Sequence, residues 1–329
     1  MIWKKKLIKI KEKIKMIYLG VDIGGTGIKV GAVTEKCELL CKESAPTQAS
    51  LGYEVLAKDI ADLCLKVMEK QNLTLEDIAG IGLGCPGSID DKNGVVLYSN
   101  NINLHHAPLC AEVKKYIDKP VFIGNDANCA AIGEYFALGR DVDNFVAITL
   151  GTGIGGGVII NKKLFTGSNG VAGELGHTSL VMDGEQCSCG RKGCWEAYAS
   201  VTALNRDALR AAEKNPDSML AKAINENGKS TGKLVFDCSD NGCPVAKQVT
   251  DRYIEYVGEG ITNLINIFQP ACFVVGGGVS GRGDKLINPV KEYVYERVYG
   301  TGTVPAVPIE IAKLGNDAGI VGAALLALL

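Results

Sequence analysis

The middle of the chain holds one histidine and three cysteines whose types and spacing suit a metal site. They are His177, Cys187, Cys189 and Cys194, in the pattern H-x9-C-x-C-x4-C. One imidazole nitrogen and three thiolates form a known tetrahedral site for structural zinc, which contributes folding free energy directly. The alternative is a loop of free or oxidised cysteines, but a Cys-x-Cys pair closes into a disulfide only under strain. The pattern therefore predicts a structural zinc knuckle.

Two carboxylates flank the predicted knuckle, Glu174 on one side and Glu196 on the other. Gly184, Gly190 and Gly193 lie between them, among the cysteines or just before them. Glycine allows the tight backbone turns that would bring four ligands onto one ion. A rigid metal clip with an acid at each end is suited to holding both acids still. The knuckle is therefore interpreted as a device that positions these two carboxylates.

A third acid lies in the polar cluster Asn125-Asp126-Ala127-Asn128. The cluster follows an expected strand, Val121–Gly124, and precedes an expected helix that runs to about Leu138. An acid at such a place is first of all a helix N-cap, which is worth ~1 kcal/mol. Capping accounts for Asp126 but not for the two asparagines crowded around it. A chemical role for Asp126 therefore stays open.

Two glycine-bearing turns each connect a pair of apolar runs. The first, Asp22–Thr26, joins Met16–Val21 to Ile28–Val33, and the second, Gly151–Gly157, joins Phe145–Leu150 to Val158–Ile160. A plain hairpin needs glycines only for positive φ. The aspartate, backbone N–H groups and threonine hydroxyl of the first turn would also suit a phosphate and its Mg²⁺. Neither turn is a P-loop, because no Gly-Lys-Ser/Thr follows. The recurrence predicts two halves of similar topology facing each other across a cleft.

The remaining pattern predicts the elements that would carry these motifs. The expected helices are Leu51–Glu69, Leu109–Ile117, segments from Ser200 to about Asn225, Val245–Phe268 and a buried terminal helix within Ala318–Leu329. The expected further strands are Ile78–Cys85, Cys272–Val275 and Pro308–Ala312, and a loop is expected around Gly232–Gly242. The glycines after Cys272–Val275 lack the G-x-G-x-x-G pattern of a dinucleotide site. Asn316 or Asp317 is expected to cap the last helix.

Composition excludes several classes of protein. The 329 residues are 47% hydrophobic and 22% charged with a formal net charge of −2, so no basic field invites nucleic acid. No apolar run reaches the ~18 residues of a membrane span. Nine of the 12 cysteines lie scattered outside the knuckle, which is typical of reduced buried thiols and indicates a cytoplasmic protein. Residues 1–15 carry seven lysines and one glutamate. A membrane-touching amphipathic helix is the alternative there, but we predict a mobile basic extension.

Six motifs together carry a family resemblance. They are D-I-G-G-T at 22–26, G-L-G-C-P-G at 82–87, N-D-A-N at 125–128, L-G-T-G-I-G-G-G at 150–157, G-E-L-G-H at 173–177 and C-S-C-G-R-K-G-C-W-E at 187–196. Over Met16–Leu329 the chain resembles the bacterial ROK-family sugar kinases (repressor, open reading frame, kinase), in particular their ATP-dependent glucokinases. The glycine turns alone mark only the wider actin-like ATPase fold, whereas the cysteine motif is close to diagnostic of the family.

The resemblance implies an α/β fold of the two-domain actin-like ATPase (ribonuclease H-like) type, with an inter-domain cleft and a structural zinc knuckle. The smaller α/β domain would comprise residues 16–122 together with a C-terminal helix at about 314–329. The larger α/β domain would comprise residues 123–313, with the zinc site and the sugar-binding residues.

The resemblance also implies site residues. ATP and its Mg²⁺ would be bound by Asp22, Gly25, Thr26, Gly27, Lys29, Gly151, Thr152, Gly153, Gly277 and Gly278. The sugar would be held by Gly87, Asn101, Asn125, Asp126, Glu174, His177 and Glu196. Asp126 matches the catalytic aspartate of the family, the base for the sugar hydroxyl, and Asp22 would hold Mg²⁺ indirectly.

The implied activity is ATP-dependent phosphorylation of a hexose, with glucose to glucose 6-phosphate as the first expectation. Kinases for N-acetylmannosamine, N-acetylglucosamine or fructose remain alternatives, as does a non-catalytic sugar sensor. The repressors of the family carry an N-terminal DNA-binding domain, and the 21 residues before Asp22 are too few for one. We therefore expect a kinase with a sugar and ATP as partners, without nucleic acid or membrane, that forms a homodimer or homotetramer.

Overall fold

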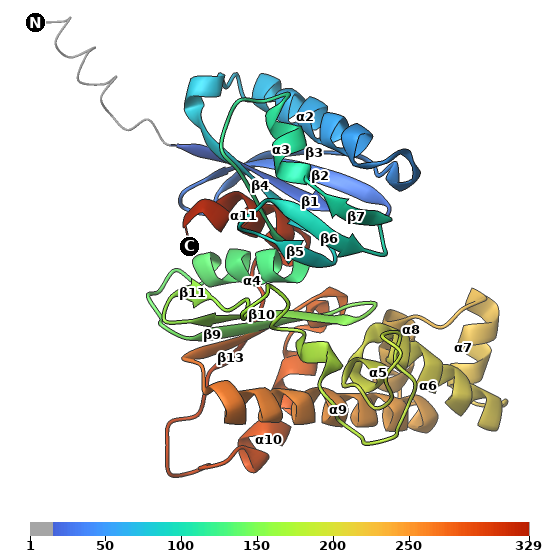
Figure 1. Ribbon diagram of the computed structural model, residues 1–329. Helices are drawn as coiled ribbons and strands as arrows, with labels where there is room; N and C mark the ends of the chain where they lie inside the picture. The colour runs from blue at the N-terminus through green and yellow to red at the C-terminus, as the bar shows by residue number, and fades with distance from the viewer. Residues whose placement is uncertain (1–15, 329) are drawn as a thin grey trace, which may run out of the picture. The chain divides into compact units, whose positions relative to one another are not determined.

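A computed structural model describes residues 16–328 of the chain (Figure 1), so the prediction for residues 1–15 lies outside the described residues. The chain divides into two compact units. Unit 1 takes residues up to 140, then 166–172 and those from 316 onward, and unit 2 takes 141–165 and 173–315. Within residues 16–328, no helix combines the length and the apolar character needed to cross a bilayer.

Unit 1 is built on a sheet with the strand order β3-β2-β1-β4-β8. Its strands are β1 (Ile17–Ile23), β2 (Gly27–Thr34), β3 (Leu39–Pro46), β4 (Ile78–Cys85) and β8 (Val121–Asn125). β2 is antiparallel to both β1 and β3, whereas β4 and β8 run parallel to β1. A smaller sheet contains β5 (Ser88–Asp90), β6 (Val95–Ser99) and β7 (Leu104–Ala107).

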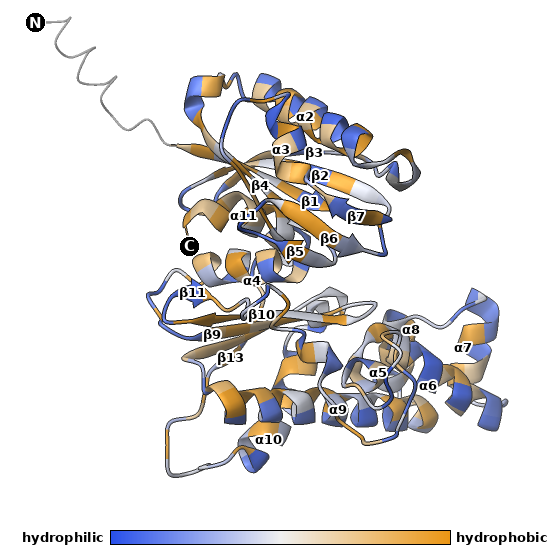
Figure 2. Ribbon diagram, in the orientation of Figure 1, coloured by the Kyte–Doolittle hydropathy of each residue, from blue (hydrophilic) through white to orange (hydrophobic). Residues whose placement is uncertain are grey.

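Four helices complete unit 1. They are α2 (Tyr53–Lys70), α3 (Leu109–Lys114), α4 (Asp126–Ala137) and α11 (Ala318–Ala324), with short 3₁₀ turns at Ala49–Leu51, Leu75–Asp77 and Leu325–Leu328. Glycines bring α11 onto the sheet: a Cβ at Gly20 would lie 1.9 Å from the Ile320 carbonyl oxygen, and one at Gly82 would lie 1.7 Å from that of Ala323. The prediction of a buried C-terminal helix is confirmed, and Figure 2 shows its apolar character alongside that of the central strands.

Unit 2 repeats the sheet topology of unit 1, with the strand order β11-β10-β9-β12-β13. Its strands are β9 (Phe145–Leu150), β10 (Ile154–Ile160), β11 (Lys163–Leu164), β12 (Cys272–Gly276) and β13 (Ile309–Ile311). Again the first three form antiparallel pairs and the last two run parallel to the first. The similar topology predicted from the two glycine-bearing hairpins is therefore confirmed.

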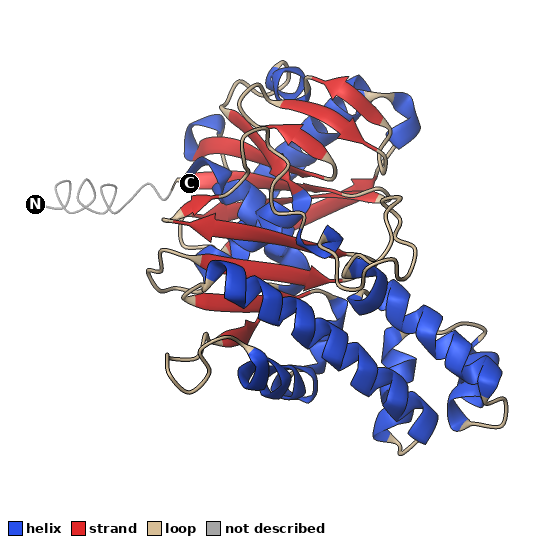
Figure 3. Cartoon of the chain, turned by 60° about the horizontal axis from the view of Figure 1, so that its bottom comes forward, coloured by secondary structure: helices blue, strands red, loops and turns tan. Residues whose placement is uncertain are grey.

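The helices of unit 2 begin at Glu196, and several of them extend to one side, away from its sheet (Figure 3). They are α5 (Glu196–Ala199), α6 (Val201–Lys214), α7 (Met219–Asn227), α8 (Gly232–Asp240), α9 (Pro244–Phe268) and α10 (Asp284–Arg297), with 3₁₀ turns at Leu175–His177, Gly278–Arg282 and Gly315–Asp317. Trp195 packs α5 against α9: its ring is 1% exposed, and a Cβ at Gly260 would lie 1.9 Å from it.

One prediction of local structure in this part of the chain was wrong. The segment around Gly232–Gly242 was expected to be a loop, but most of it forms α8. Thr231 caps this helix by accepting the Leu234 N–H, and Val235 and Phe236 are buried. Capping and burial therefore outweigh the glycines at both ends, of which Gly242 adopts a left-handed φ of 81° just after the helix. The strands β3, β5, β6, β7 and β11 were not predicted at all.

The division of the chain also differs from the expected domain boundary. The expected boundary lay between residues 122 and 123, whereas the units divide after residue 140. The reason is that α4 packs closely on α11 of unit 1. A Cβ at Gly133 would lie 2.5 Å from the Ala318 carbonyl oxygen, and one at Gly322 would lie 1.6 Å from that of Cys129. These contacts bind the N-D-A-N segment to unit 1.

Candidate active site and metal centre

The histidine and the three cysteines of the predicted knuckle converge in unit 2. Their ligand atoms all lie within 4.8 Å of one another. The Cys187 Sγ and the His177 Nδ1 are 3.6 Å apart, and the sulfurs of Cys189 and Cys194 are 3.7 Å apart. A tetrahedral zinc would place two sulfurs about 3.8 Å apart and a sulfur and a nitrogen about 3.6 Å apart. The donor set therefore fits zinc, and the sulfurs are too far apart for a disulfide, which needs about 2.05 Å.

Burial makes the charged forms of two of these cysteines unfavourable while no cation is bound. Burial, reinforced by the neighbouring thiols, raises the pKa of Cys194 to about 12. Burial likewise raises the pKa of Cys187. Thiolates are the form that binds metal, so a doubly charged ion would supply the stabilisation that these buried thiols lack by themselves.

The backbone of the knuckle turns at two of the three glycines that were expected to serve it. Gly190 and Gly193 adopt left-handed φ values of 89° and 83°. A Cβ at Gly193 would also lie 1.7 Å from the Val181 carbonyl oxygen. Gly184 has no left-handed φ and is needed for a different reason. A Cβ there would lie 1.8 Å from the Tyr198 hydroxyl oxygen, which accepts the Glu185 N–H at 2.6 Å.

Glu196 is held at the second glycine turn. One carboxylate oxygen accepts the Ile154 N–H at 2.9 Å, and the other accepts the Ser188 hydroxyl at 3.2 Å. Ser188 lies between two of the candidate metal ligands, so the knuckle contacts Glu196 directly. A Cβ at Gly153 would lie 2.2 Å from the Glu196 Oε2. Gly153, which was assigned to phosphate approach, is thus also required to make room for this carboxylate.

Glu174 differs from Glu196 in its surroundings. It is exposed and precedes the 3₁₀ turn Leu175–His177, where its carbonyl oxygen accepts the His177 N–H at 3.0 Å. Among residues 16–328, its carboxylate makes no hydrogen bond or ion pair, so the knuckle restrains it only through the backbone. His177 turns its Nδ1 towards Cys187, which leaves Nε2 as the nitrogen for a further partner.

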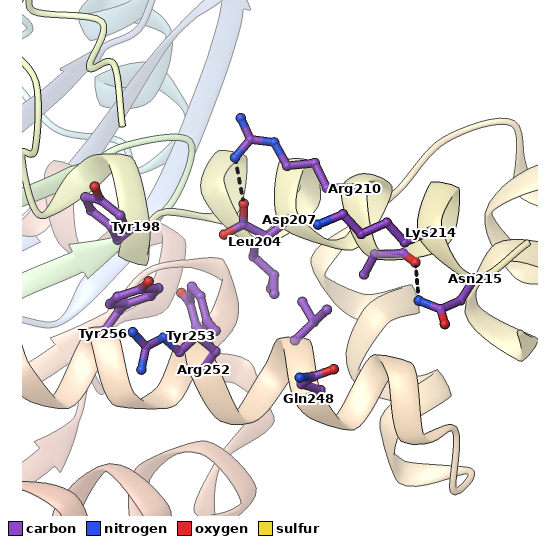
Figure 4. A pocket seen from close by; sticks show the side chains of 12 residues that line it. Tyr198, Leu204, Asp207, Arg210, Lys214, Asn215, Gln248, Arg252, Tyr253 and Tyr256 are labelled. Carbon is purple, nitrogen blue, oxygen red and sulfur yellow. Dashed lines mark hydrogen bonds and ion pairs between the residues drawn. The ribbon is translucent and has the colours of Figure 1, made fainter. Parts of the chain in front are cut away.

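Unit 2 also contains a cavity of about 380 Å³, which is lined by residues of α5, α6 and α9 (Figure 4). Arg210 in its wall binds Glu185 and approaches Asp207, and the Arg252 guanidinium stacks on the Tyr256 ring at 4.7 Å. None of the residues predicted to bind sugar or ATP lines this cavity. Arg210 and Arg252 already have acidic or aromatic partners, and we do not assign the cavity to either substrate.

In unit 1 the N-D-A-N segment forms the start of α4, where Asn125 and Asp126 take different positions. Asn125, not Asp126, is the N-cap of α4, because its side-chain oxygen accepts the N–H groups of Ala127 and Asn128 at 2.9 and 3.2 Å. Asp126 is the first residue of the helix. The amide of Asn125 also donates to the Gly87 carbonyl oxygen at 3.2 Å. The structure therefore brings Gly87, Asn125 and Asp126 together.

Asp22 lies at the end of β1, next to Lys29 on β2, with 3.1 Å between the Lys29 Nζ and the Asp22 Oδ2. Burial raises the pKa of the Cys129 thiol strongly, and the charges of Asp126 and Asp22 raise it further. Both carboxylates therefore act on the same buried thiol in unit 1. A Cβ at Gly25 would lie 3.2 Å from the Asn101 carbonyl oxygen, so Asn101 borders the first glycine turn.

The glycine turns expose backbone donors. None of Gly24, Gly25, Gly151 and Gly153 has a left-handed φ, so the plain hairpin explanation for these glycines is not supported. In the part of the chain that the structure describes, the N–H groups of Gly25 and Thr26, and those of Thr152 and Gly153, have no hydrogen-bond acceptor. Successive N–H groups without acceptors are the form of an anion-binding nest.

The third glycine segment follows β12 in unit 2. Gly277 has a left-handed φ of 87°, and a Cβ there would lie 2.3 Å from the Leu150 carbonyl oxygen. The segment is therefore packed against the residue that precedes the second glycine turn. Gly278 has open space on its Cβ side, with no atom within 4 Å. These features leave room for a ligand beside Gly278.

The profile of the ROK family matches residues 18–329. The chain belongs to the ROK family. It is 39% identical to a glucokinase of Thermotoga maritima, over 95% of this chain and 96% of that protein. A glucokinase of Halalkalibacterium halodurans is 38% identical over 93% of both chains. The crystal structure of a ROK family glucokinase from Streptomyces griseus in complex with glucose and AMPPNP shares 37% identity and a TM-score of 0.79, covering 94% of this chain and 98% of that one. The actin-like fold expected for a ROK member is thereby supported.

Sequence reasoning missed several residues of this ROK site. Ser188 could have been predicted, since it lies between Cys187 and Cys189 in the candidate metal cluster. Thr47 and Thr202 had no such signal in the sequence, because each contacts a glycine turn that lies far from it along the chain.

Proposed function

We propose that this ROK-family chain is an ATP-dependent hexokinase that converts glucose to glucose 6-phosphate. Its similarity to glucokinases over nearly its whole length supports the reaction class. The observation that carries the assignment is at the N-terminus of α4. Asn125 caps that helix, and Asp126 is its first residue, with one carboxylate oxygen accepting the Ala127 N–H at 2.9 Å. We propose Asp126 as the base.

Asp126 would orient the sugar hydroxyl and accept its proton. Phosphoryl transfer passes through a loose transition state in which positioning and charge neutralisation dominate. The N-terminal end of α4 favours negative charge at Asp126. A carboxylate is a weak base that takes the proton late, and such assistance is worth roughly 100- to 10,000-fold in rate.

The nucleotide would be held by backbone donors. The free N–H groups at Gly25 and Thr26, with those at Thr152 and Gly153, would bind phosphate oxygens. Gly277 and Gly278 would border the adenosine. Asp22 would hold Mg²⁺ indirectly, with Lys29 beside it, and Mg²⁺ would neutralise charge on the transferred phosphate.

The sugar would be recognised by acceptors and donors at fixed angles. We assign Asn125, Glu174, His177 and Glu196 to its hydroxyls, with Gly87 and Asn101 at the edge. Zinc would bind the Nδ1 of His177, which fixes the tautomer and leaves the Nε2 as an N–H donor. The metal would be structural, but it would also position the side chains that determine the specificity for the sugar.

The test is a panel of hexoses and N-acetylhexosamines at one ATP concentration, with ADP release as the measurement. Glucose should show the highest kcat/KM. A higher value for N-acetylmannosamine, N-acetylglucosamine or fructose would move the assignment to that sugar. Pocket contacts shift such preferences by only a few kcal/mol, so the whole panel is needed. Binding of glucose without ADP release would indicate the sugar sensor instead.

A further inference from the structure

We propose that Thr47 and Thr202 are matching positioning residues, each of which orients one peptide of a phosphate-binding turn through its hydroxyl. The inference rests on the proposed function, because it concerns how the two glycine turns bind the nucleotide phosphates. Neither threonine belongs to a glycine motif, and neither would touch the sugar.

In unit 1 the contact is between Thr47 and Gly24. The Thr47 hydroxyl donates to the Gly24 carbonyl oxygen at 2.6 Å, and the Thr47 N–H donates to the Thr26 carbonyl oxygen at 3.2 Å. The Gly24 carbonyl shares a peptide plane with the Gly25 N–H, and in a trans peptide the two point in opposite directions. Fixing the carbonyl on one side therefore fixes the Gly25 N–H on the other.

In unit 2 the contact is between Thr202 and Thr152. The Thr202 hydroxyl donates to the Thr152 carbonyl oxygen at 2.7 Å. The neighbouring Val201 N–H donates to the Gly151 carbonyl oxygen at 2.8 Å. These two carbonyls share peptide planes with the Thr152 and Gly153 N–H groups, the two donors of this turn that have no acceptor within residues 16–328.

The two arrangements agree although different elements build them. Thr47 follows β3, whereas Thr202 lies in the first turn of α6. In each unit one hydroxyl and one backbone N–H donate to two carbonyl oxygens of the turn. In unit 1 both donors belong to Thr47, and in unit 2 they belong to Thr202 and the preceding Val201. Glycine peptides flip easily, because no Cβ opposes the alternative φ and ψ values. Donors held in advance in the binding orientation raise affinity by lowering the ordering cost on binding.

The experiment compares Thr47→Val and Thr202→Val in the full chain, since valine keeps the shape and removes the hydroxyl. Thr47→Ser and Thr202→Ser restore the hydroxyl and should rescue. Thr303→Val is the matched control, because the Thr303 hydroxyl donates to the Gly300 carbonyl oxygen at 2.7 Å in an exposed loop of unit 2. The measurements are the Kd of a non-hydrolysable ATP analogue by calorimetry without sugar, the KM values for ATP and glucose, and the melting temperature.

Each valine variant should raise the analogue Kd and the KM for ATP roughly two- to tenfold, the effect of one hydrogen bond. The KM for glucose should change less than twofold. Unchanged analogue Kd in both valine variants would overturn the inference, as would serine variants that fail to rescue. An equal loss of both substrates with a lower melting temperature would also overturn it, since it marks a merely structural role. If wild-type protein binds the analogue but phosphorylates no hexose, the proposed function fails while the Kd comparison still decides this inference.

Discussion

Two adjacent residues, Asn125 and Asp126, occupy different positions at the start of α4, the N-cap and the first helical residue. Asn125 satisfies the first N–H groups of α4, which is the task that a helix start demands of a polar side chain. Asp126 is the next residue and the first of the helix, and its carboxylate accepts the Ala127 N–H at 2.9 Å. A substitution of Asp126 can therefore be interpreted as a change in chemistry, while the loss of the cap can be measured separately at Asn125.

Asp126→Asn should lower kcat about 100-fold or more while sugar affinity stays within roughly tenfold. The amide keeps the shape of the side chain but cannot accept the proton. Steady-state kinetics and sugar titration are the measurements. The control is Asn125→Ala, which should reduce the free energy of unfolding by about 1 kcal/mol through loss of the cap. A near wild-type kcat in Asp126→Asn would place the base elsewhere.

Gly153→Ala should raise the KM for the sugar about tenfold, because the new Cβ displaces the Glu196 carboxylate from the Ile154 N–H. The control is Gly281→Ala, where a Cβ also meets no protein atom within 4 Å and which has no proposed role in binding either substrate. Kinetics in both substrates, with melting temperatures, are the measurements. If Gly153→Ala changes only the KM for ATP, the glycine serves the phosphate alone and the contact with Glu196 is incidental.

The knuckle acts as one element in which the candidate metal ligands are connected to Glu196, the acid that we propose binds the sugar. Ser188, between Cys187 and Cys189, donates to Glu196. Trp195 then anchors the end of the knuckle by donating its indole N–H to the Tyr256 carbonyl oxygen at 2.7 Å. Loss of the ion should release this connection near the sugar while leaving the first glycine turn, which belongs to unit 1, unaffected.

Cys187→Ser, or removal of zinc by a chelator, should therefore raise the KM for the sugar at least about tenfold and the KM for ATP much less. Zinc content by elemental analysis should be about one ion per wild-type chain and reduced in the variant. Cys37→Ser is the control, since Cys37 lies in unit 1 outside the metal cluster. Active wild-type protein without zinc, or an equal rise in both KM values, would refute the coupling.

At the scale of the whole molecule, the two units share one sheet topology and one arrangement of glycine turn and hydroxyl donor. The chain enters unit 1, builds unit 2, and ends in unit 1 with α11. That helix packs against β1 and β4, where Gly20 and Gly82 leave no room for a Cβ. The last helix is thus part of the core of unit 1 rather than an appendage.

Deletion of residues 1–15 should leave the melting temperature and activity nearly unchanged, because the first strand of unit 1 begins at Ile17. Deletion from residue 318 onward is the contrasting variant and should prevent folding of unit 1, because it removes α11 from the core. Thermal unfolding and ADP release measure both. A large loss of kcat in the N-terminal deletion would show that the lysine-rich segment is needed.

Much of the architecture could be predicted from local pattern. The limits of β4 and β9 follow from apolar runs that end at polar or turn-forming residues, and the candidate metal cluster follows from the spacing of its cysteines. The repeated hairpin is visible because the same residue types recur around each turn. These features are determined by the sequence alone because their signals lie within a few residues of one another.

Contacts between segments distant in sequence were decided only by the tertiary structure. The Glu196 carboxylate occupies the space that a side chain at Gly153 would fill, although the two residues are far apart in the sequence. Thr47 binds the Gly24 carbonyl, and α4 joins unit 1 through α11. In each case the local residues permit several partners, and the choice depends on which side chains close packing brings within hydrogen-bond distance. Helix α8 formed for the same reason, because burial of Val235 and Phe236 overrides a local preference for a loop.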